Sequence, residues 1–189
     1  MDDAEEDMLL VADYRDNGNA AAIDRLVSKY GKSLLAYLCA TTRNSSDAED
    51  VFQDTWLKAM KKIHSFKGGS FKAWLTTIAR NGIIDRSRRK RPSVSLNQEI
   101  GEDGAEIGDI IEDTSAKKPE AGLVSDERTA RIREAVAALP DTQKEVFLLR
   151  TEQDLSFAEI AEMLKIPLNT ALGRMHYAVT RLRKELADI

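Results

Sequence analysis

Apolar residues recur at every third or fourth position over long stretches of this chain, and this spacing constrains the fold more than any other feature. Between residues 20 and 38 they share one side of a helix: Ile23, Leu26, Val27, Tyr30, Leu34, Tyr37 and Leu38. Strand-like alternation is hard to find, and the 189 residues include only 4 Pro and 10 Gly. The pattern therefore predicts an all-α fold.

Turn-forming and capping residues divide the first half into helices. The DNGN tetrad at 16–19 ends a first helix, and Asn19 is the expected N-cap of the next. Ser46 and Glu49 have the spacing of a capping box, which predicts a helix over 47–63. A loop with two glycines, HSFKGGS, then leads into a helix that starts aromatic and ends strongly basic at Arg91.

The second half is typical of a helix-turn-helix unit. Ser156 and Glu159 form a second capping box, and a turn at 165–167 leads into a long final helix. Small and apolar residues are expected to seat that helix on its neighbours: Ala161, Ile166, Ala171, Met175, Ala178 and Leu182. Its N-terminal residues are then placed to enter a major groove.

Composition changes sharply between the two halves. Residues 92–125 hold two prolines, four glycines and many acids, which predicts a flexible acidic linker. We expect two small helical domains, at 1–92 and 125–189, joined by a linker at 93–124. The linker is either a passive tether or an anchor whose isoleucines bind a partner groove while its acids imitate a nucleic-acid strand.

The net charge of −4 conceals a strongly basic stretch. From Arg80 to Arg91 the chain carries six basic residues against the single acid Asp85. Affinity for a polyanion depends on the local patch, and a cationic helix end is the expected footprint of phosphate contact. The sequence therefore allows nucleic-acid binding despite its acidic average.

Metal, redox and membrane functions find no support in the sequence. Cys39 is the single cysteine and lies in an apolar run, which predicts a buried, inert thiol. His64 and His176 are far apart, and no nucleophile stands beside a base, so we expect no metal, no cofactor and no catalytic site. No signal segment or apolar run of about 20 residues is present, which predicts a cytoplasmic protein without a membrane span.

One helical face in the first half is open to two interpretations. Five residues of the helix over 47–63 point outward: Asp50, Gln53, Asp54, Leu57 and Lys61. Charges alone indicate an ordinary solvated face. Leu57 among them is the one hint of a contact surface.

Three segments together resemble the small extracytoplasmic-function (ECF) members of the sigma-70 family. They are DAEDVFQDTWLKA at 47–59, FKGGSFKAWLTTIARN at 66–81 and LSFAEIAEMLKIPLNTALGRMHYAVTRLRKEL at 155–186. The resemblance implies a sigma region 2 helical bundle followed by a sigma region 4 helix-turn-helix. It also implies a non-enzymatic factor that directs core RNA polymerase to promoters.

The resemblance also implies partners and site residues. Core polymerase is contacted through its β′ clamp helices and its β flap, and an anti-sigma factor is an expected regulator. The clamp falls on Asp50, Gln53, Asp54 and Leu57. The −10 element, with a base pocket, falls on Lys62, Phe66, Lys67, Ile78, Asn81, Arg86, Arg88, Arg89 and Arg91. The −35 element falls on Thr170, Arg174, His176, Tyr177 and Arg181.

The final helix departs from the family pattern. Leu172, Gly173 and Tyr177 stand where arginine, lysine or serine is usual, which predicts unusual or weak −35 recognition. Two other functions compete with a sigma factor. A helix-turn-helix operator-binding regulator would bind duplex DNA tightly without polymerase, whereas a nucleic-acid enzyme would need a metal or nucleophile that the sequence does not offer.

Overall fold

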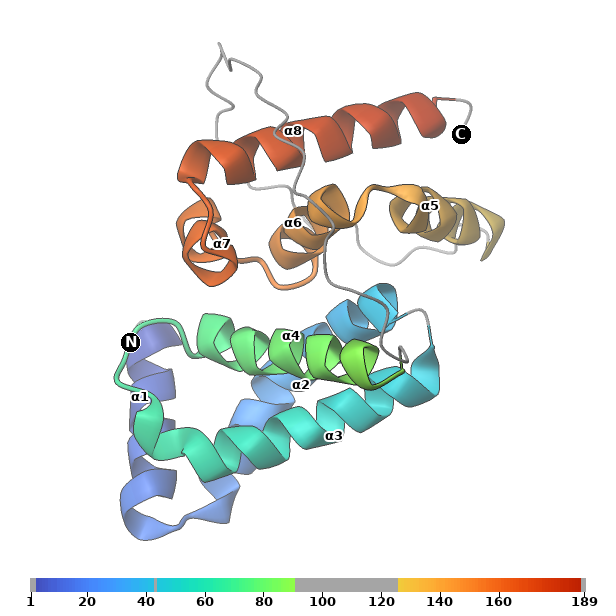
Figure 1. The fold of residues 1–189 in the computed structure, drawn as a ribbon. Coiled ribbons are helices and arrows are strands. Elements are labelled where there is room, and N and C mark those ends of the chain that lie inside the picture. The colour runs from blue at the N-terminus through green and yellow to red at the C-terminus, as the bar shows by residue number, and fades with distance from the viewer. Residues whose placement is uncertain (1–2, 43, 91–125, 188–189) are drawn as a thin grey trace.

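The computed structural model describes residues 3–42, 44–90 and 126–187, and these segments contain helices and no strand (Figure 1). The all-α prediction is therefore confirmed. Arg91 and the expected linker at 93–124 lie outside the described residues. The elements in chain order are α1 (Asp3–Asn17), α2 (Ala20–Thr42), α3 (Ser45–Lys62), η1 (Ile63–Ser65), α4 (Phe71–Lys90), α5 (Asp126–Ala138), α6 (Asp141–Thr151), α7 (Phe157–Leu164) and α8 (Leu168–Glu185).

The helices form two domains that pack directly against each other. Helices α1 to α4 make the first domain and α5 to α8 the second, with α6 and α7 next to the first domain and α8 on the far side (Figure 1). Buried residues of both domains, such as Leu34 in the first and Leu149 in the second, belong to one continuous hydrophobic cluster. The two DNA-reading candidates, α4 and α8, are thus held in a single compact arrangement.

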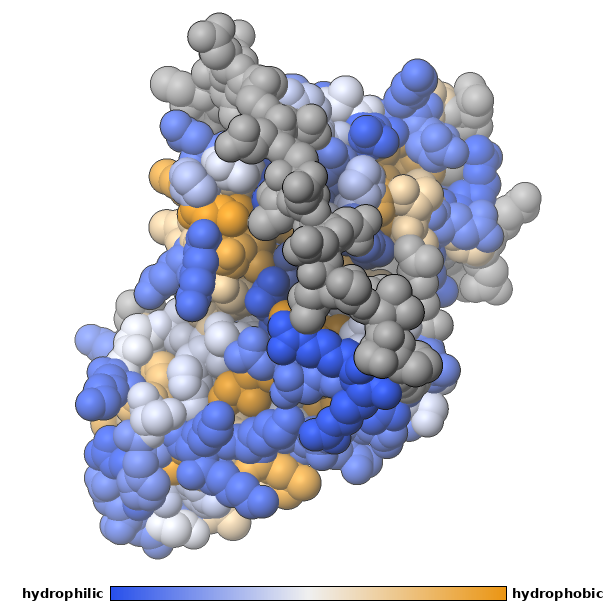
Figure 2. All heavy atoms as spheres, in the orientation of Figure 1, coloured by the Kyte–Doolittle hydropathy of each residue, from blue (hydrophilic) through white to orange (hydrophobic). Residues whose placement is uncertain are grey.

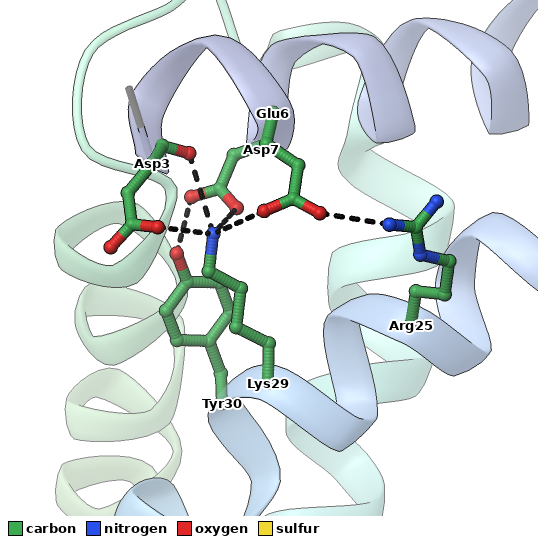
Figure 3. Close-up of polar contacts among 6 residues, drawn as sticks. All are labelled: Asp3, Glu6, Asp7, Arg25, Lys29 and Tyr30. Atoms are coloured by element: carbon green, nitrogen blue, oxygen red, sulfur yellow. Dashed lines mark hydrogen bonds and ion pairs between the residues drawn. The ribbon is translucent and has the colours of Figure 1, made fainter. Parts of the chain in front are cut away.

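A network of charged side chains fixes α1 on α2 (Figure 3). Asp7 is 3% exposed, and it accepts hydrogen bonds from the Tyr30 hydroxyl and from Lys29 Nζ, the latter at 2.8 Å. Arg25 donates to Glu6 at 2.8 Å at the edge of the network. A buried carboxylate without such donors would destabilise the fold strongly, so α1 has one favoured position on α2.

Two of the three predicted helix caps are confirmed. Asn19 Oδ1 accepts from the backbone N–H of Ala21 at 3.1 Å, and Ser156 with Glu159 forms the expected capping box at the start of α7. The capping box of Ser46 and Glu49 is wrong. The N-cap of α3 is Asn44, which has an extended backbone and accepts from the N–H of Asp47 at 3.2 Å.

Cys39 is exposed, so the prediction of a buried thiol is also wrong. Tyr37 and Leu38 belong to the buried face of α2, and Cys39 lies beyond the edge of that face.

Among the described residues, none of the helices combines the length and apolar character that a bilayer crossing requires.

Candidate nucleic-acid and polymerase interfaces

Helix α3 presents a polar face with one large apolar residue on it. The four residues expected there, Asp50, Gln53, Asp54 and Leu57, are all exposed. They follow the helical period and lie opposite Val51, Thr55 and Trp56, which are buried. Leu57 is 50% exposed and leaves an apolar contact point among three polar side chains.

Phe66 lies inside the protein rather than on its surface. Its ring is 3% exposed and stands 5.5 Å, centroid to centroid, from both Phe71 and Trp74. The expectation that Phe66 receives an extruded base is therefore corrected: its faces are occupied by the aromatic start of α4. The adjacent glycines Gly68 and Gly69, with φ of +113° and +83°, allow the loop to fold the phenylalanine inward.

A different aromatic residue lies at the surface of α4. Trp74 is partly buried, packs against the cluster that contains Phe66, and shares a stripe of α4 with Ile78, Asn81 and Arg88. The stripe follows from the spacing, because residues seven apart return to nearly the same direction on a helix. Asn81 and Arg88 are exposed, and Ile78 is partly buried. Lys62, at the end of α3, and Lys67, in the loop before α4, are also exposed.

Trp74 was not among the DNA contacts expected from the sequence. The signal that could have found it is its seven-residue spacing from Asn81.

Arg86 is bound to α3. Its Nε and Nη2 donate to Asp47 Oδ1 at 3.0 and 2.8 Å, and Nη2 also donates to Asp50 Oδ2 at 2.7 Å. Arg88 and Arg89 are exposed, and Figure 2 shows the most hydrophilic side chains of this face gathered over the C-terminal half of α4 and the adjoining α3. The basic tract therefore contains arginines in two different environments.

A shallow groove separates α3 from α4 beside this ion pair. It is lined by Val51, Asp54, Lys58, Gly82, Asp85, Arg86 and Arg89. A Cβ atom on Gly82 would lie 3.3 Å from Val51 Cγ1, so the glycine allows the two helices to approach closely. The expected polymerase face and the expected DNA face are thus directly coupled by packing.

The final helix is seated as predicted. Ala171, Ala178 and Leu182 are buried, Met175 packs against the core, and Ala161 is buried where α7 meets it. Among the expected DNA contacts, His176, Tyr177 and Arg181 are exposed, whereas Thr170 and Arg174 are partly buried. The His176 and Tyr177 rings stand edge to face, 5.7 Å apart.

Polar contacts also join the two domains, and sequence reasoning missed them. Gln153 is 2% exposed; its Nε2 donates to the backbone oxygen of Ser33 at 2.8 Å, and its Oε1 accepts from the Thr76 hydroxyl at 3.1 Å. Arg80 Nε donates to Glu145 at 2.7 Å across the same boundary. Arg80 thus belongs to the contact between domains.

Glu159 contributes to the same boundary. Although partial burial opposes it, hydrogen bonds from Ser156 and from Ser70 of the first domain lower the pKa of its carboxyl. In the part of the chain that the structure describes, no three His, Cys, Asp or Glu side chains gather in a way that could hold a metal ion.

Both domains match family models. Residues 26–92 match Sigma-70 region 2, and residues 129–185 match Sigma-70, region 4. The chain is 33% identical over 175 residues to the ECF RNA polymerase sigma factor SigW of Bacillus subtilis, covering 91% of this chain and 92% of that protein. It is 31% identical over 168 residues to the RNA polymerase sigma factor YlaC of the same organism, covering 87% and 92%.

Solved structures show the same fold. CnrH, in complex with the cytosolic domain of CnrY, superposes with a TM-score of 0.69 at 24% identity, covering 97% of this chain and 99% of that one. The sigma factor RpoE of Bartonella quintana, in complex with the anti-sigma factor NepR, gives a TM-score of 0.63 at 22% identity, covering 87% and 96%. From the two family models and these relatives, the chain belongs to the sigma-70 family and is an RNA polymerase sigma factor of the ECF type.

Proposed function

We propose that this sigma factor binds core RNA polymerase through α3, holds one separated strand of the −10 element on α4, and reads the −35 duplex with α8. The observation that carries the proposal is the stripe on α4. Trp74, Asn81 and Arg88 succeed one another along the helix at intervals of about 10 Å, which brings an aromatic ring, an amide and a cation onto one surface.

The order of these three groups along α4 suits the binding of single-stranded DNA. Extruding a base costs a few kcal/mol, and stacking on an aromatic side chain returns about 1–3 kcal/mol per base, so capture favours the separated strand. Trp74 supplies the ring in place of the buried Phe66, with Ile78 as an apolar wall and Asn81 as a hydrogen-bonding partner. Lys62, Lys67, Arg88 and Arg89 supply cations for phosphates, and the separation needs no catalytic chemistry from the chain.

The outward face of α8 suits a duplex groove. Side-chain donors on a recognition helix can reach base edges in the major groove, and arginine pairs well with guanine. We assign this reading to Arg174, with Thr170, His176, Tyr177 and Arg181 as further contacts to bases or phosphates.

The exposed face of α3 is assigned to polymerase. Leu57 gives the apolar anchor that protein interfaces favour, and Asp50, Gln53 and Asp54 surround it with polar groups that fix orientation. We propose the β′ clamp helices as the partner of this face and the β flap as the partner of the second domain.

We further propose that an anti-sigma factor regulates the chain in the cytoplasm. The solved complex of RpoE with the anti-sigma factor NepR supports this assignment, because it pairs a protein of this fold with such a factor.

The substitution Asn81→Ala tests the assignment of α4. It should slow open-complex formation by the full chain and core polymerase while leaving closed-complex affinity nearly unchanged. The measurement is permanganate footprinting of unpaired thymines beside a filter-binding assay. Ser87→Ala, an exposed residue of the same helix away from the stripe, is the matched control. Equal loss at both stages would remove Asn81 from the strand-binding surface.

A second experiment tests the assignment of α3. A variant with Gln53, Asp54 and Leu57 all replaced by alanine should fail to capture core polymerase in a pull-down, whereas Lys32→Ala, on the exposed side of α2, should capture it normally. Normal capture by the triple variant would contradict the polymerase-binding face.

A further inference from the structure

Arg86 has two carboxylate partners on another helix. Its Nη2 lies 2.8 Å from Asp47 Oδ1 and 2.7 Å from Asp50 Oδ2, and both acids belong to α3. Asp47 and Asp50 are three residues apart, so they stand on the same side of α3 and face α4 together. The guanidinium therefore bridges the two helices from a single side chain.

The charge of this cluster argues against a phosphate contact. Three hydrogen bonds direct the guanidinium toward the carboxylates of α3, and these negative charges offset its attraction for a phosphate. Hydrogen bonds that Arg86 donates to Asp47, and then to Asp50, raise the pKa of Arg86, so the cation is stabilised by its present partners. Arg88 and Arg89, two and three residues further on, are exposed.

The same cluster reaches the surface that we assign to polymerase. The side chain of Asp47 is 17% exposed and that of Asp50 is 54% exposed. Arg86 therefore forms one ion pair with the mostly buried carboxylate of Asp47 and a second with the accessible carboxylate of Asp50. One turn earlier on α4, Gly82 meets Val51 of α3, so packing and the ion pair fix the same pair of helices at adjacent turns.

We propose that Arg86 is a positioning residue of the polymerase-binding face: it orients Asp50 and fixes α3 against α4, and it makes no phosphate contact. The proposal rests on the proposed function of α3 and α4. It changes the expected role of Arg86 from a DNA contact to a support for polymerase binding.

The test compares Arg86→Ala with Arg88→Ala in the full chain. Arg86→Ala should weaken binding to core polymerase about fivefold, and Arg88→Ala should not weaken it. With saturating core polymerase and a pre-melted promoter, Arg88→Ala should reduce the slope of log K against log salt by about 0.7, the value for one phosphate contact on a single strand. Arg86→Ala should leave that slope unchanged.

Two conservative variants keep the proposal testable if Arg86→Ala fails to fold, which circular dichroism would show. Lysine keeps the charge, and a phosphate contact would survive that change, but a lysine cannot reproduce the three hydrogen bonds of the guanidinium. Arg86→Lys should therefore still weaken polymerase binding. Asp47→Asn should weaken it in the same direction, and the Arg86→Ala, Asp47→Asn double variant should lose less than the sum of the two.

The outcomes distinguish a failure of the Arg86 proposal from a failure of the functions proposed for α3 and α4. A slope that falls for Arg86→Ala as it does for Arg88→Ala, or polymerase binding that is unchanged in Arg86→Ala and Arg86→Lys, overturns the positioning role. If Arg88→Ala and Arg89→Ala both leave the slope unchanged, the DNA-binding function of α4 is contradicted instead. If the triple α3 variant binds polymerase normally, the polymerase-binding function of α3 fails.

Discussion

Helices α4 and α8 have similar lengths, 20 and 18 residues, but they bury side chains of different sizes. The first half of α4 buries large side chains, Phe71 and Leu75, and continues that apolar surface outward through Trp74. Helix α8 buries small side chains, Ala171 and Ala178, and so lies close to its neighbours with its opposite face open. The comparison teaches that an aromatic edge suits a separated strand, whereas a closely seated polar helix suits a duplex groove.

The largest effect should come from the aromatic core under α4. Phe66→Ala removes a ring that is 3% exposed and should lower the free energy of unfolding by about 3–5 kcal/mol. Urea denaturation followed by tryptophan fluorescence measures this, because both tryptophans, Trp56 and Trp74, lie in the first domain. Phe66→Leu should cost clearly less. A small loss for Phe66→Ala would mean that the ring is accessible after all.

Trp74→Ala sharpens the single-strand side of the comparison. It should reduce open-complex formation about tenfold, because one base loses its stacking partner. Trp74→Tyr keeps an aromatic ring and should restore most of the activity, which stopped-flow fluorescence of a labelled promoter can follow. If the alanine and tyrosine variants are equally impaired, the ring is needed for packing against Phe66 rather than for DNA.

Salt dependence tests the duplex side. Arg181→Ala on α8 should reduce the slope of log K against log salt by about 0.9 for a −35 duplex, the value for one phosphate contact on B-DNA. The same variant should leave binding to a single-stranded −10 oligonucleotide unchanged, and Arg88→Ala should show the reverse pattern. Anisotropy titrations of the polymerase-bound chain give both slopes. Matching changes on both DNA forms would erase the distinction between the two helices.

The smallest expected effect is a loss of stability at alkaline pH in the domain that contains α4. Burial and a hydrogen bond to Asp7 raise the pKa of Tyr30 above its ordinary value of 10.0. Burial opposes the shift of Lys29, but its contacts with Asp7 raise its pKa above 10.5. Because both pKa values are raised on folding, the stabilisation is complete below about pH 10 and is lost as the pH rises through the folded values.

Thermal unfolding followed by tryptophan fluorescence from pH 8 to pH 11.5 should therefore show a falling midpoint above pH 10. Tyr30→Phe, which cannot titrate, should start lower and fall less steeply. An equally steep fall in that variant would assign the alkaline sensitivity to groups other than Tyr30.

Helices and the seating of α8 could be predicted because they depend on local periodicity. Ala171, Ala178 and Leu182 recur at the spacing of a buried helical face, and the capping box of Ser156 is a short-range pattern. The start of α3 was harder, since the NSS run at 44–46 offers three possible caps. The structure favours Asn44, whose extended backbone lets its side chain reach the N–H of Asp47.

The site was less predictable than the fold because its decisive contacts are distant in sequence. Phe66 follows a turn and precedes two glycines, and nothing local shows that α4 folds back to cover its ring. Arg86 and Asp47 are 39 residues apart, so their pairing depends on how α3 crosses α4. A run of arginines therefore indicates charge but does not show which members of the run are available.

The hydrogen bonds of Gln153 connect the domain that contains α8 to the domain that contains α4. While its amide bridges Ser33 and Thr76, the two domains are linked at one relative position, and on the proposed function this position sets the separation of the two DNA segments that α4 and α8 would bind. Opening the domains would exchange these bonds for bonds to water, at about 0.5–1.5 kcal/mol per hydrogen bond, and would also expose the apolar residues that both domains bury in one cluster. Apolar burial therefore supplies most of the resistance to opening, and the bonds of Gln153 add a polar link at the same boundary.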